Sequence, residues 1–272
     1  MKTDKITQCI FIHYSLTPKI PYNVRIYIEE LSGYFDKITV LTNNKEIQNE
    51  KSLFNEKVDF YSMINQGYDF GMFYRYISKE NLDKYSQIAL INDSNVLINK
   101  LDHVFQWANK ENPDFWGIID SYEKPWFSSH EENYHLQSHF IVFNQQAIEK
   151  LPFFLNQMNI EEIMNEKDLK KVRRLVIDKW EIGLSQYFLK NGLKVDCFIK
   201  SNELIEKYKP SKFNLTHSLY HELAKEGYPF IKKKVILEKK KLFRRKNNDW
   251  QKTIAQFGNQ DWNLTKIIES LQ

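Results

Sequence analysis

The chain has 272 residues, of which 42% are hydrophobic and 15% aromatic, and this content excludes a disordered chain because it suffices for a substantial core. The formal net charge is +4, from 39 basic and 35 acidic residues. The run Lys232 to Lys246 holds nine basic residues and one glutamate, so the remainder carries 30 basic and 34 acidic residues. The basicity is therefore local, which argues against a nucleic-acid-binding surface spread over the whole protein.

No apolar run approaches the ~18 residues that indicate a membrane span. Near the start, the apolar stretch Cys9 to Ile12 is too short for the core of a secretory signal. We therefore expect a cytoplasmic protein. Cys9 and Cys197 each lie in an apolar, strand-like segment, and we expect buried free thiols rather than a disulfide.

Short apolar runs rich in β-branched residues alternate with longer helical patterns. This alternation is typical of an α/β sandwich with a mostly parallel central sheet flanked by helices. The predicted helices are Asn23–Tyr34, Leu101–Lys110 and Asp168–Lys190, the last ended by Gly192. The predicted strands are Gln8–Tyr14, Lys37–Thr42, Gln87–Asn92, Phe115–Ile119, Ser138–Phe143 and Leu193–Ile199.

The composition changes only near Lys232. We therefore divide the chain into a catalytic body, residues 1–231, and a basic helical C-terminal appendage, residues 232–272. Polar residues follow the first three strands: His13-Tyr14-Ser15, Asn43-Asn44 and Asn92-Asp93-Ser94. Ligands of open α/β sheets bind beyond the carboxyl ends of the strands, so these tips predict a small-molecule crevice.

The segment Asn65-Gln-Gly67-Tyr-Asp69-Phe-Gly71 opens a helical pattern. Its two glycines would let the backbone approach a ligand closely, and Asp69 would accept hydrogen bonds from hydroxyl groups. The alternative is structural, since glycines before a helix commonly serve as turns and caps. The segment matches neither the phosphate-binding loop of nucleoside triphosphatases nor the dinucleotide-binding fingerprint.

Asp93 directly follows an apolar strand. A carboxylate in this position can hold Mg²⁺ or Mn²⁺ against a diphosphate, because such hard ions take one or two carboxylates together with phosphate oxygens. The ion would offset the charge that develops on a leaving diphosphate. The alternative is that Asp93 only caps the following turn.

A third group of residues suits sugar hydroxyls, which need hydrogen-bonding partners beside an apolar surface. It comprises Trp116, Asp120, His135, Gln137 and Ser138. The pairs His135/His139 and His217/His221 have three-residue spacing, but neither is accompanied by a third ligand, so we do not predict a zinc site.

Glu181 lies on the border of the apolar side of the predicted helix Asp168–Lys190. The apolar side consists of Val172, Val176, Trp180, Gly183 and Tyr187, and the polar strip of Arg174, Asp178 and Ser185. A carboxylate partly sheltered by apolar side chains could have the raised basicity that a general base needs. The alternative is a solvated glutamate without a catalytic role.

In order and spacing, these segments resemble the rhamnan-synthesis F-type family of bacterial polysaccharide glycosyltransferases. The resemblance spans roughly residues 8–235. Two departures stand out: His139 replaces an expected aromatic residue, and Asp93 is a single carboxylate in place of an Asp-x-Asp motif, which leaves metal dependence open. The matching segments are His13-Tyr14, Gly67-Tyr-Asp-Phe-Gly71, Ile91-Asn-Asp-Ser94, Phe115-Trp-Gly117, His135-Leu-Gln-Ser138 and Trp180-Glu-Ile-Gly183.

The resemblance implies a nucleotide-binding fold of the glycosyltransferase A type and an inverting transfer of a sugar, rhamnose or another hexose, from a nucleotide-diphosphate donor to a bacterial surface glycan. It implies that Asp93 faces the diphosphate with Mn²⁺ or Mg²⁺, and that Glu181 takes the acceptor proton. Asp120 is the second candidate for the base, because it lies close in sequence to Trp116 and Gly117. The resemblance also implies that the donor site is formed by His13, Asn65, Gly67, Asp69, Gly71, Asn92, Asp93 and Ser94.

Two other functions stay open on sequence alone. The basic run and the many aromatic residues would suit a nucleic-acid-binding protein, but the acidic body argues against it, and we expect no nucleic-acid partner. A glycan-binding protein without turnover is the other possibility. For the transferase, we expect a glycan or lipid-linked glycan acceptor and a peripheral contact of residues 232–246 with the inner face of the cell membrane.

Overall fold

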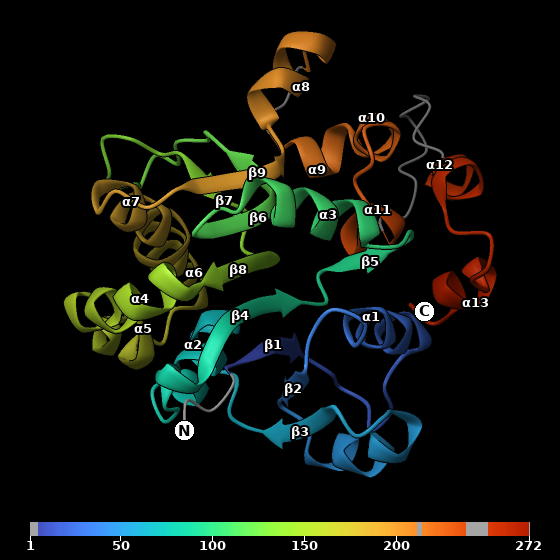
Figure 1. Cartoon of the computed structure of the whole chain (residues 1–272), viewed down its shortest axis with the longest axis horizontal. Helices are drawn as coiled ribbons and strands as arrows, with labels where there is room; N and C mark the ends of the chain where they lie inside the picture. Colours follow the sequence, from blue (N-terminus) through green and yellow to red (C-terminus); the bar gives the residue numbers. More distant parts are fainter. Residues whose placement is uncertain (1–4, 211–213, 238–249, 272) are drawn as a thin grey trace.

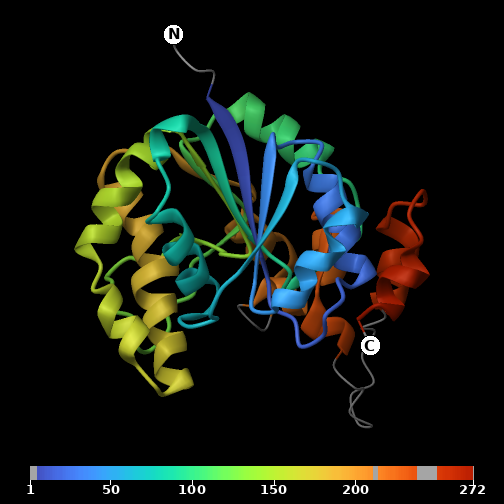
Figure 2. The same ribbon diagram turned by 90° about the horizontal axis from the view of Figure 1, so that it is seen from below.

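The computed structural model describes residues 5–210, 214–237 and 250–271. Most of these residues form a three-layer α/β sandwich (Figures 1 and 2). The strands are β1 (Ile6–His13), β2 (Lys37–Thr42), β3 (Val58–Ser62), β4 (Tyr85–Asn92), β5 (Asn95–Leu97), β6 (Phe115–Ser121), β7 (His135–Leu136), β8 (Phe140–Asn144), β9 (Val195–Ile199) and β10 (Phe230–Lys232).

Helices of several lengths connect the strands. The short 3₁₀ segments are η1 (Lys45–Leu53) and η2 (Leu82–Lys84), and η3 (Val176–Ile182) is a π-helix. The α-helices are α1 (Tyr22–Leu31), α2 (Tyr68–Ile77), α3 (Asp102–Glu111), α4 (Gln145–Gln157), α5 (Ile160–Asn165), α6 (Leu169–Leu175), α7 (Gly183–Lys190), α8 (Ser201–Tyr208), α9 (Leu215–Ser218), α10 (Tyr220–Lys225), α11 (Lys233–Leu237), α12 (Trp250–Phe257) and α13 (Leu264–Glu269).

The main sheet has the strand order β3-β2-β1-β4-β8-β6-β7, with β9 paired to β6. The pairs among β1, β2, β3 and β4 are parallel, as is the pair of β6 and β9, whereas β8 runs antiparallel to both of its neighbours. The predicted mostly parallel sheet flanked by helices is thus confirmed. Each predicted strand is present, and its ends differ from the prediction by at most two residues.

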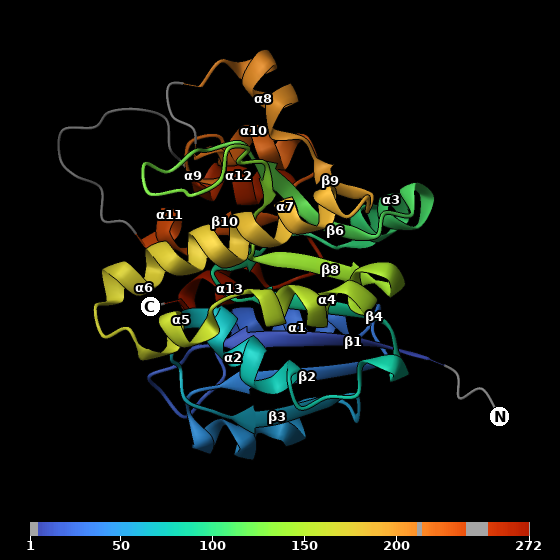
Figure 3. The same ribbon diagram turned by 90° about the vertical axis from the view of Figure 1, so that its left-hand side faces the viewer.

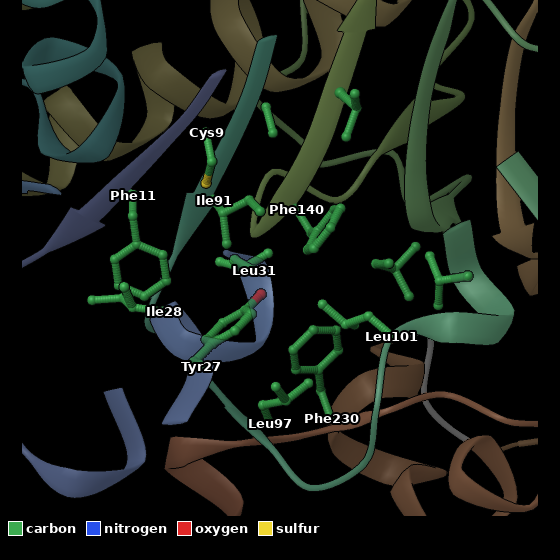
Figure 4. Close-up of a cluster of buried hydrophobic side chains, with 14 of the residues drawn as sticks. Cys9, Phe11, Tyr27, Ile28, Leu31, Ile91, Leu97, Leu101, Phe140 and Phe230 are labelled. Carbon is green, nitrogen blue, oxygen red and sulfur yellow. The ribbon is translucent and has the colours of Figure 1, made fainter. Parts of the chain in front are cut away.

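Alternate residues of each strand face opposite helical layers, so the central strands are apolar on both sides. On β1, Cys9 and Phe11 pack in the core with α1 and α3, while Ile10 and Ile12 pack in the core with α2 and α4. Figure 4 shows part of the first core, where the ring of Tyr27 packs against those of Phe11 and Phe230. Both cysteines are buried and free, as predicted.

The helix predicted over Asp168–Lys190 is continuous in space but has three parts, α6, η3 and α7, which together form a rod across one layer (Figure 3). Its beginning at Leu169 is capped by Asp168, which accepts hydrogen bonds from the backbone of Lys170 and Lys171. The middle turn is a π-helix, a geometry that is frequent at functional sites. It turns Asp178 inward, and Ser185 on α7 is buried as well, although the helical pattern placed both on a polar strip.

The C-terminal region packs against the body. Strand β10 pairs antiparallel with β5, so Lys232 lies opposite Asn95. Helix α13 contacts α1 through a hydrogen bond of 3.0 Å from the Asn23 backbone to Ser270. The division of the chain at Lys232 stays a prediction, and residues 238–246 of the basic run lie outside the described residues. Among the described residues, none of the helices has the length and apolar character needed to cross a bilayer.

Candidate functional site

The candidate site lies at the end of the sheet where strands of opposite direction end and begin. The parallel strands β1, β4 and β6 end there, and the antiparallel strand β8 begins there. The residues that follow β4 and β6, and those that precede β8, are therefore brought together at this edge. A cavity of about 700 Å³ opens beside them, a size typical of small-molecule sites.

The cavity walls contain seven of the residues predicted from sequence to bind donor or substrate or to act in catalysis. They come from α2, the end of β4, the segment before β8, and η3. These residues are Asp69, Asn92, Ser94, His135, Gln137, Ser138 and Glu181.

The remaining predicted residues do not line this cavity. Asn65 is exposed beside α2, whereas His13 is buried and Asp93, which follows Asn92 in the chain, is partly buried. Trp116 lies in the core, where its ring packs on Phe105, Trp107 and Phe140. Asp120 is 2% exposed and accepts a hydrogen bond of 2.6 Å from the backbone of Ser201 at the start of α8.

The two glycines of the Gly67–Gly71 segment have structural roles. Gly67 precedes α2 with φ of +80°, a conformation that other residues adopt at a cost. At Gly71, a Cβ atom would lie 1.7 Å from the carbonyl oxygen of Gln66, so only glycine fits this close backbone approach. Together they hold the start of α2, and with it Asp69, against the end of β4.

Glu181 points into the cavity from η3. Its carboxylate accepts a hydrogen bond of 2.8 Å from the Ser138 hydroxyl. Ser138 lies just before β8, so this contact fixes the carboxylate relative to the sheet edge. The Glu181 side chain is partly exposed and lines the cavity.

Asp69 lines the same cavity as Glu181 and accepts a hydrogen bond of 2.7 Å from the Asn92 side chain. Its removal from water, together with the negative charges of Asp93 and Glu181, raises the pKa of Asp69 to about 7. The hydrogen bond from Asn92 opposes this shift. A carboxyl group with this pKa is half protonated near neutral pH, so it can both donate and accept hydrogen bonds.

The Asp93 carboxylate differs from that of Asp69 because its pKa is lowered. Its Oδ2 atom lies 2.7 Å from Nδ1 of His13 and 2.7 Å from Nζ of Lys233. Burial opposes its ionisation, but the hydrogen bond from His13 and the charge of Lys233 outweigh burial and lower the pKa of Asp93. The carboxylate is therefore ionised and compensated by groups of the protein.

The side chains around Asp93 do not fit the divalent cation that the sequence predicted there. The ammonium of Lys233 and the imidazole of His13 both contact Oδ2 of the carboxylate, so this oxygen already has two partners from the protein. Within the described parts of the chain, no group of three or more His, Cys, Asp or Glu side chains is arranged to hold a metal ion.

Four cationic side chains line the cavity, and the sequence analysis did not single them out. They come from α6 and β10: Lys170, Arg173, Arg174 and Lys232. The spacing could have revealed the first three, because Lys170, Arg173 or Arg174, Ile177 and Glu181 follow each other by three or four residues on one helical face. Nothing local to Lys232 distinguishes it from the other lysines of the basic run.

Aromatic and polar groups complete the walls. Pro125 and Phe127 lie on the loop between β6 and β7, and this loop is tied to η3 by two hydrogen bonds from Ser129 to Asp178, of 2.7 and 2.8 Å. His135 contacts the carbonyl oxygen of Asn133 at 2.7 Å through Nδ1, which fixes its ring at the wall. The arrangement combines a carboxylate, cations and hydrogen-bonding side chains in one cavity.

The family model described as Rhamnan synthesis protein F matches residues 38–261, which include every residue of this cavity. The chain belongs to the rhamnan synthesis protein F family. Two curated relatives, both named Virulence protein VirA and both from Vibrio anguillarum, are 26% identical to this family member over 211 residues. The matched region covers 65% of this chain and 62% of theirs, so the chain spans less than two thirds of the length of the curated relatives it matches.

Solved structures similar to this rhamnan synthesis protein F family member include HddC from Yersinia pseudotuberculosis, with a TM-score of 0.37 and 14% identity over 54% of this chain and 80% of that one. They also include a 4-diphosphocytidyl-2C-methyl-D-erythritol synthase from Anaerococcus prevotii, with a TM-score of 0.43 and 8% identity over 72% of this chain and 89% of that one. Both likenesses are distant, and the strand order given above defines the fold.

Proposed function

We propose that this protein is an inverting glycosyltransferase of the glycosyltransferase A type, which transfers a sugar from a nucleoside-diphosphate donor to a bacterial surface glycan. The observation that carries the proposal is the placement of Glu181, held by Ser138, in a cavity that is also lined by four cationic side chains. Membership of the rhamnan synthesis family supports a role in polysaccharide synthesis.

An inverting transfer needs a base for the acceptor hydroxyl and positive charge for the leaving diphosphate, and Glu181 and the cationic side chains can supply them. The acceptor hydroxyl oxygen forms a bond to the anomeric carbon of the sugar. At the same time the bond from that carbon to the diphosphate oxygen breaks, and its electron pair leaves with the diphosphate. Glu181 accepts the proton of the hydroxyl, and the cationic side chains stabilise the charge on the departing diphosphate.

The wall formed by α2 and the end of β4 is the proposed donor side. Asp69, with its pKa of about 7, lies there beside Asn92 and Ser94, so donor hydroxyls would find both donors and acceptors of hydrogen bonds. His135, Gln137 and Ser138 line the cavity from the segment before β8 and form the proposed acceptor side.

The acceptor is proposed to be a glycan or a lipid-linked glycan, which would be reached from the cytoplasmic face of the membrane. Residues 232–246 are proposed to contribute a peripheral contact, because each cation near an anionic lipid surface contributes roughly 1 kcal/mol at low salt. Co-sedimentation with anionic liposomes tests this contact. Binding that is unchanged when Lys239, Lys240 and Lys241 are replaced by glutamine would contradict it.

Incubation of the purified protein with UDP-, dTDP- and GDP-sugars tests the proposed activity, with release of the nucleoside diphosphate as the readout. We expect one donor class to be consumed, and more rapidly when an acceptor glycan is added. Glycan binding without consumption of any donor would contradict the transferase and would support the alternative of a binding protein.

A further inference from the structure

Lys233 is a fixed part of the Asp93 environment. Its backbone N–H donates a hydrogen bond of 3.0 Å to the carbonyl oxygen of Ser94, directly after the pairing of β10 with β5. The side chain then places Nζ 2.7 Å from the Asp93 carboxylate. Backbone pairing therefore holds the main chain of Lys233 within reach of Asp93.

The Asp93 carboxylate is already neutralised by this contact. Lys233 supplies one positive charge, and His13 contacts the same oxygen at 2.7 Å from the other side. A divalent cation bound to that oxygen would lie next to the ammonium group of Lys233. At such separations two like charges repel strongly in a partly buried site, so the ion and the lysine exclude each other.

Three carboxylates line the cavity itself, those of Asp69, Glu123 and Glu181. Asp69 is hydrogen-bonded to Asn92, and Glu181 to Ser138. As stated above, the described residues include no cluster that would hold a metal. The cationic side chains of the cavity wall are therefore the positive charge that the described residues offer to a diphosphate.

Lys232 and Arg173 supply that charge from two different elements. Lys232 reaches the cavity from β10 and Arg173 from α6, and both line it. Burial lowers the pKa of Lys232 most, the charges of Glu181 and Glu123 oppose this shift, and Lys234 and Arg173 add smaller lowering effects. Both cations can contact an anion bound in the cavity, and guanidinium groups bind phosphate oxygens in a bidentate manner.

We infer that Lys232 and Arg173 bind the diphosphate of the donor without a divalent cation, and that Lys233 takes the place at Asp93 that a metal ion would otherwise hold. This inference rests on the proposed function, since it concerns the same donor site. The inference assigns Lys232 and Lys233 to the donor site, whereas the later basic residues of the run have no part in it.

Calorimetric titration of the full chain with UDP, dTDP and GDP tests the inference. Each nucleotide is measured in EDTA, in Mg²⁺ and in Mn²⁺. For the nucleotide that binds, we expect dissociation constants in the three buffers that agree within about twofold. We further expect Lys232→Met and Arg173→Met each to weaken binding in EDTA by roughly tenfold or more, since each removes a charged contact to phosphate.

Lys84→Met is the matched control. Lys84 pairs with Glu80 near the start of β4, at the opposite edge of the sheet, so its loss should leave nucleotide affinity unchanged. Binding that occurs in Mg²⁺ or Mn²⁺ but disappears in EDTA would overturn the inference and leave the proposed function intact. The absence of binding by all three nucleotides in all three buffers would overturn both. The parent measurement in EDTA decides these outcomes even where a variant fails to fold.

Discussion

Ser138 donates a hydrogen bond of 2.8 Å to Glu181 and so joins two segments that are 43 residues apart in the sequence. One partner precedes β8 at the edge of the sheet, and the other lies in the π-helix η3 that crosses above it. The contact orients the only carboxylate that η3 presents to the cavity, and the first prediction depends on it.

Ser138→Ala should lower kcat for sugar transfer by roughly 10- to 100-fold, because a hydrogen bond to a charged group contributes about 1.5–3 kcal/mol. The KM for the donor should change little, because Ser138 is proposed to position Glu181 on the acceptor side and not to bind the donor. Ser138→Thr keeps the hydroxyl and should restore part of the rate. Ser86→Ala, far from the cavity, serves as the control; a rate loss in that variant as large as in Ser138→Ala would remove the basis for a positioning role.

Asp69 should make the stability of the protein depend on pH. In the folded protein its pKa is raised from 3.8 to about 7, so the folded state binds more protons than the unfolded state between these values. The contribution of Asp69 to the free energy of unfolding therefore falls as the pH rises from about 4 to about 7. Asp69→Asn cannot ionise, and its Tm relative to the parent should rise by a few degrees between about pH 5 and about pH 8. A Tm difference that does not change with pH would show that the Asp69 pKa is not raised.

The loop between β6 and β7 should depend on Asp178. This buried carboxylate accepts two hydrogen bonds from Ser129, and an asparagine has a single carbonyl oxygen with which to replace them. Asp178→Asn should cost about 1–3 kcal/mol, which corresponds to a fall in Tm of several degrees. Asp168→Asn is the matched control, since asparagine caps a helix as well as aspartate does. Equal Tm values for Asp178→Asn and the parent would contradict the account of this loop.

Much of the fold could be predicted from the sequence, because the buried strands are short apolar runs separated by helical patterns. Helix α4 was not predicted, and it contains Pro152 in its interior, a residue that usually ends a helix. Strand β3 was also missed; it is an edge strand of five residues that is only partly buried, so its apolar pattern is weak.

The candidate site was predicted less completely. Asp69, Asn92 and Glu181 could be found because each belongs to a motif with a polar residue in an apolar setting. The ion pair between Asp93 and Lys233 could not, because 140 residues separate the partners and only the pairing of β10 with β5 brings them together. Trp116, in contrast, was predicted to lie in the site but lies in the core. Its strand pattern fits either a binding wall or a core, and only the packing of α3 against it distinguishes the two.

The most direct test of the proposed transferase compares donor turnover by the parent and by Glu181→Gln. If Glu181 takes the acceptor proton, the variant should lose about 10²–10⁴-fold in transfer rate. Its affinity for the nucleoside diphosphate and its Tm should stay near the parental values, because the Gln side chain keeps the size of Glu and a carbonyl oxygen that can accept from Ser138. Asp120→Asn, measured alongside, is expected to act mainly through stability, since Asp120 caps the start of α8 and does not line the cavity. Retention of most activity by Glu181→Gln, with loss of activity in a folded Asp120→Asn, would contradict the account.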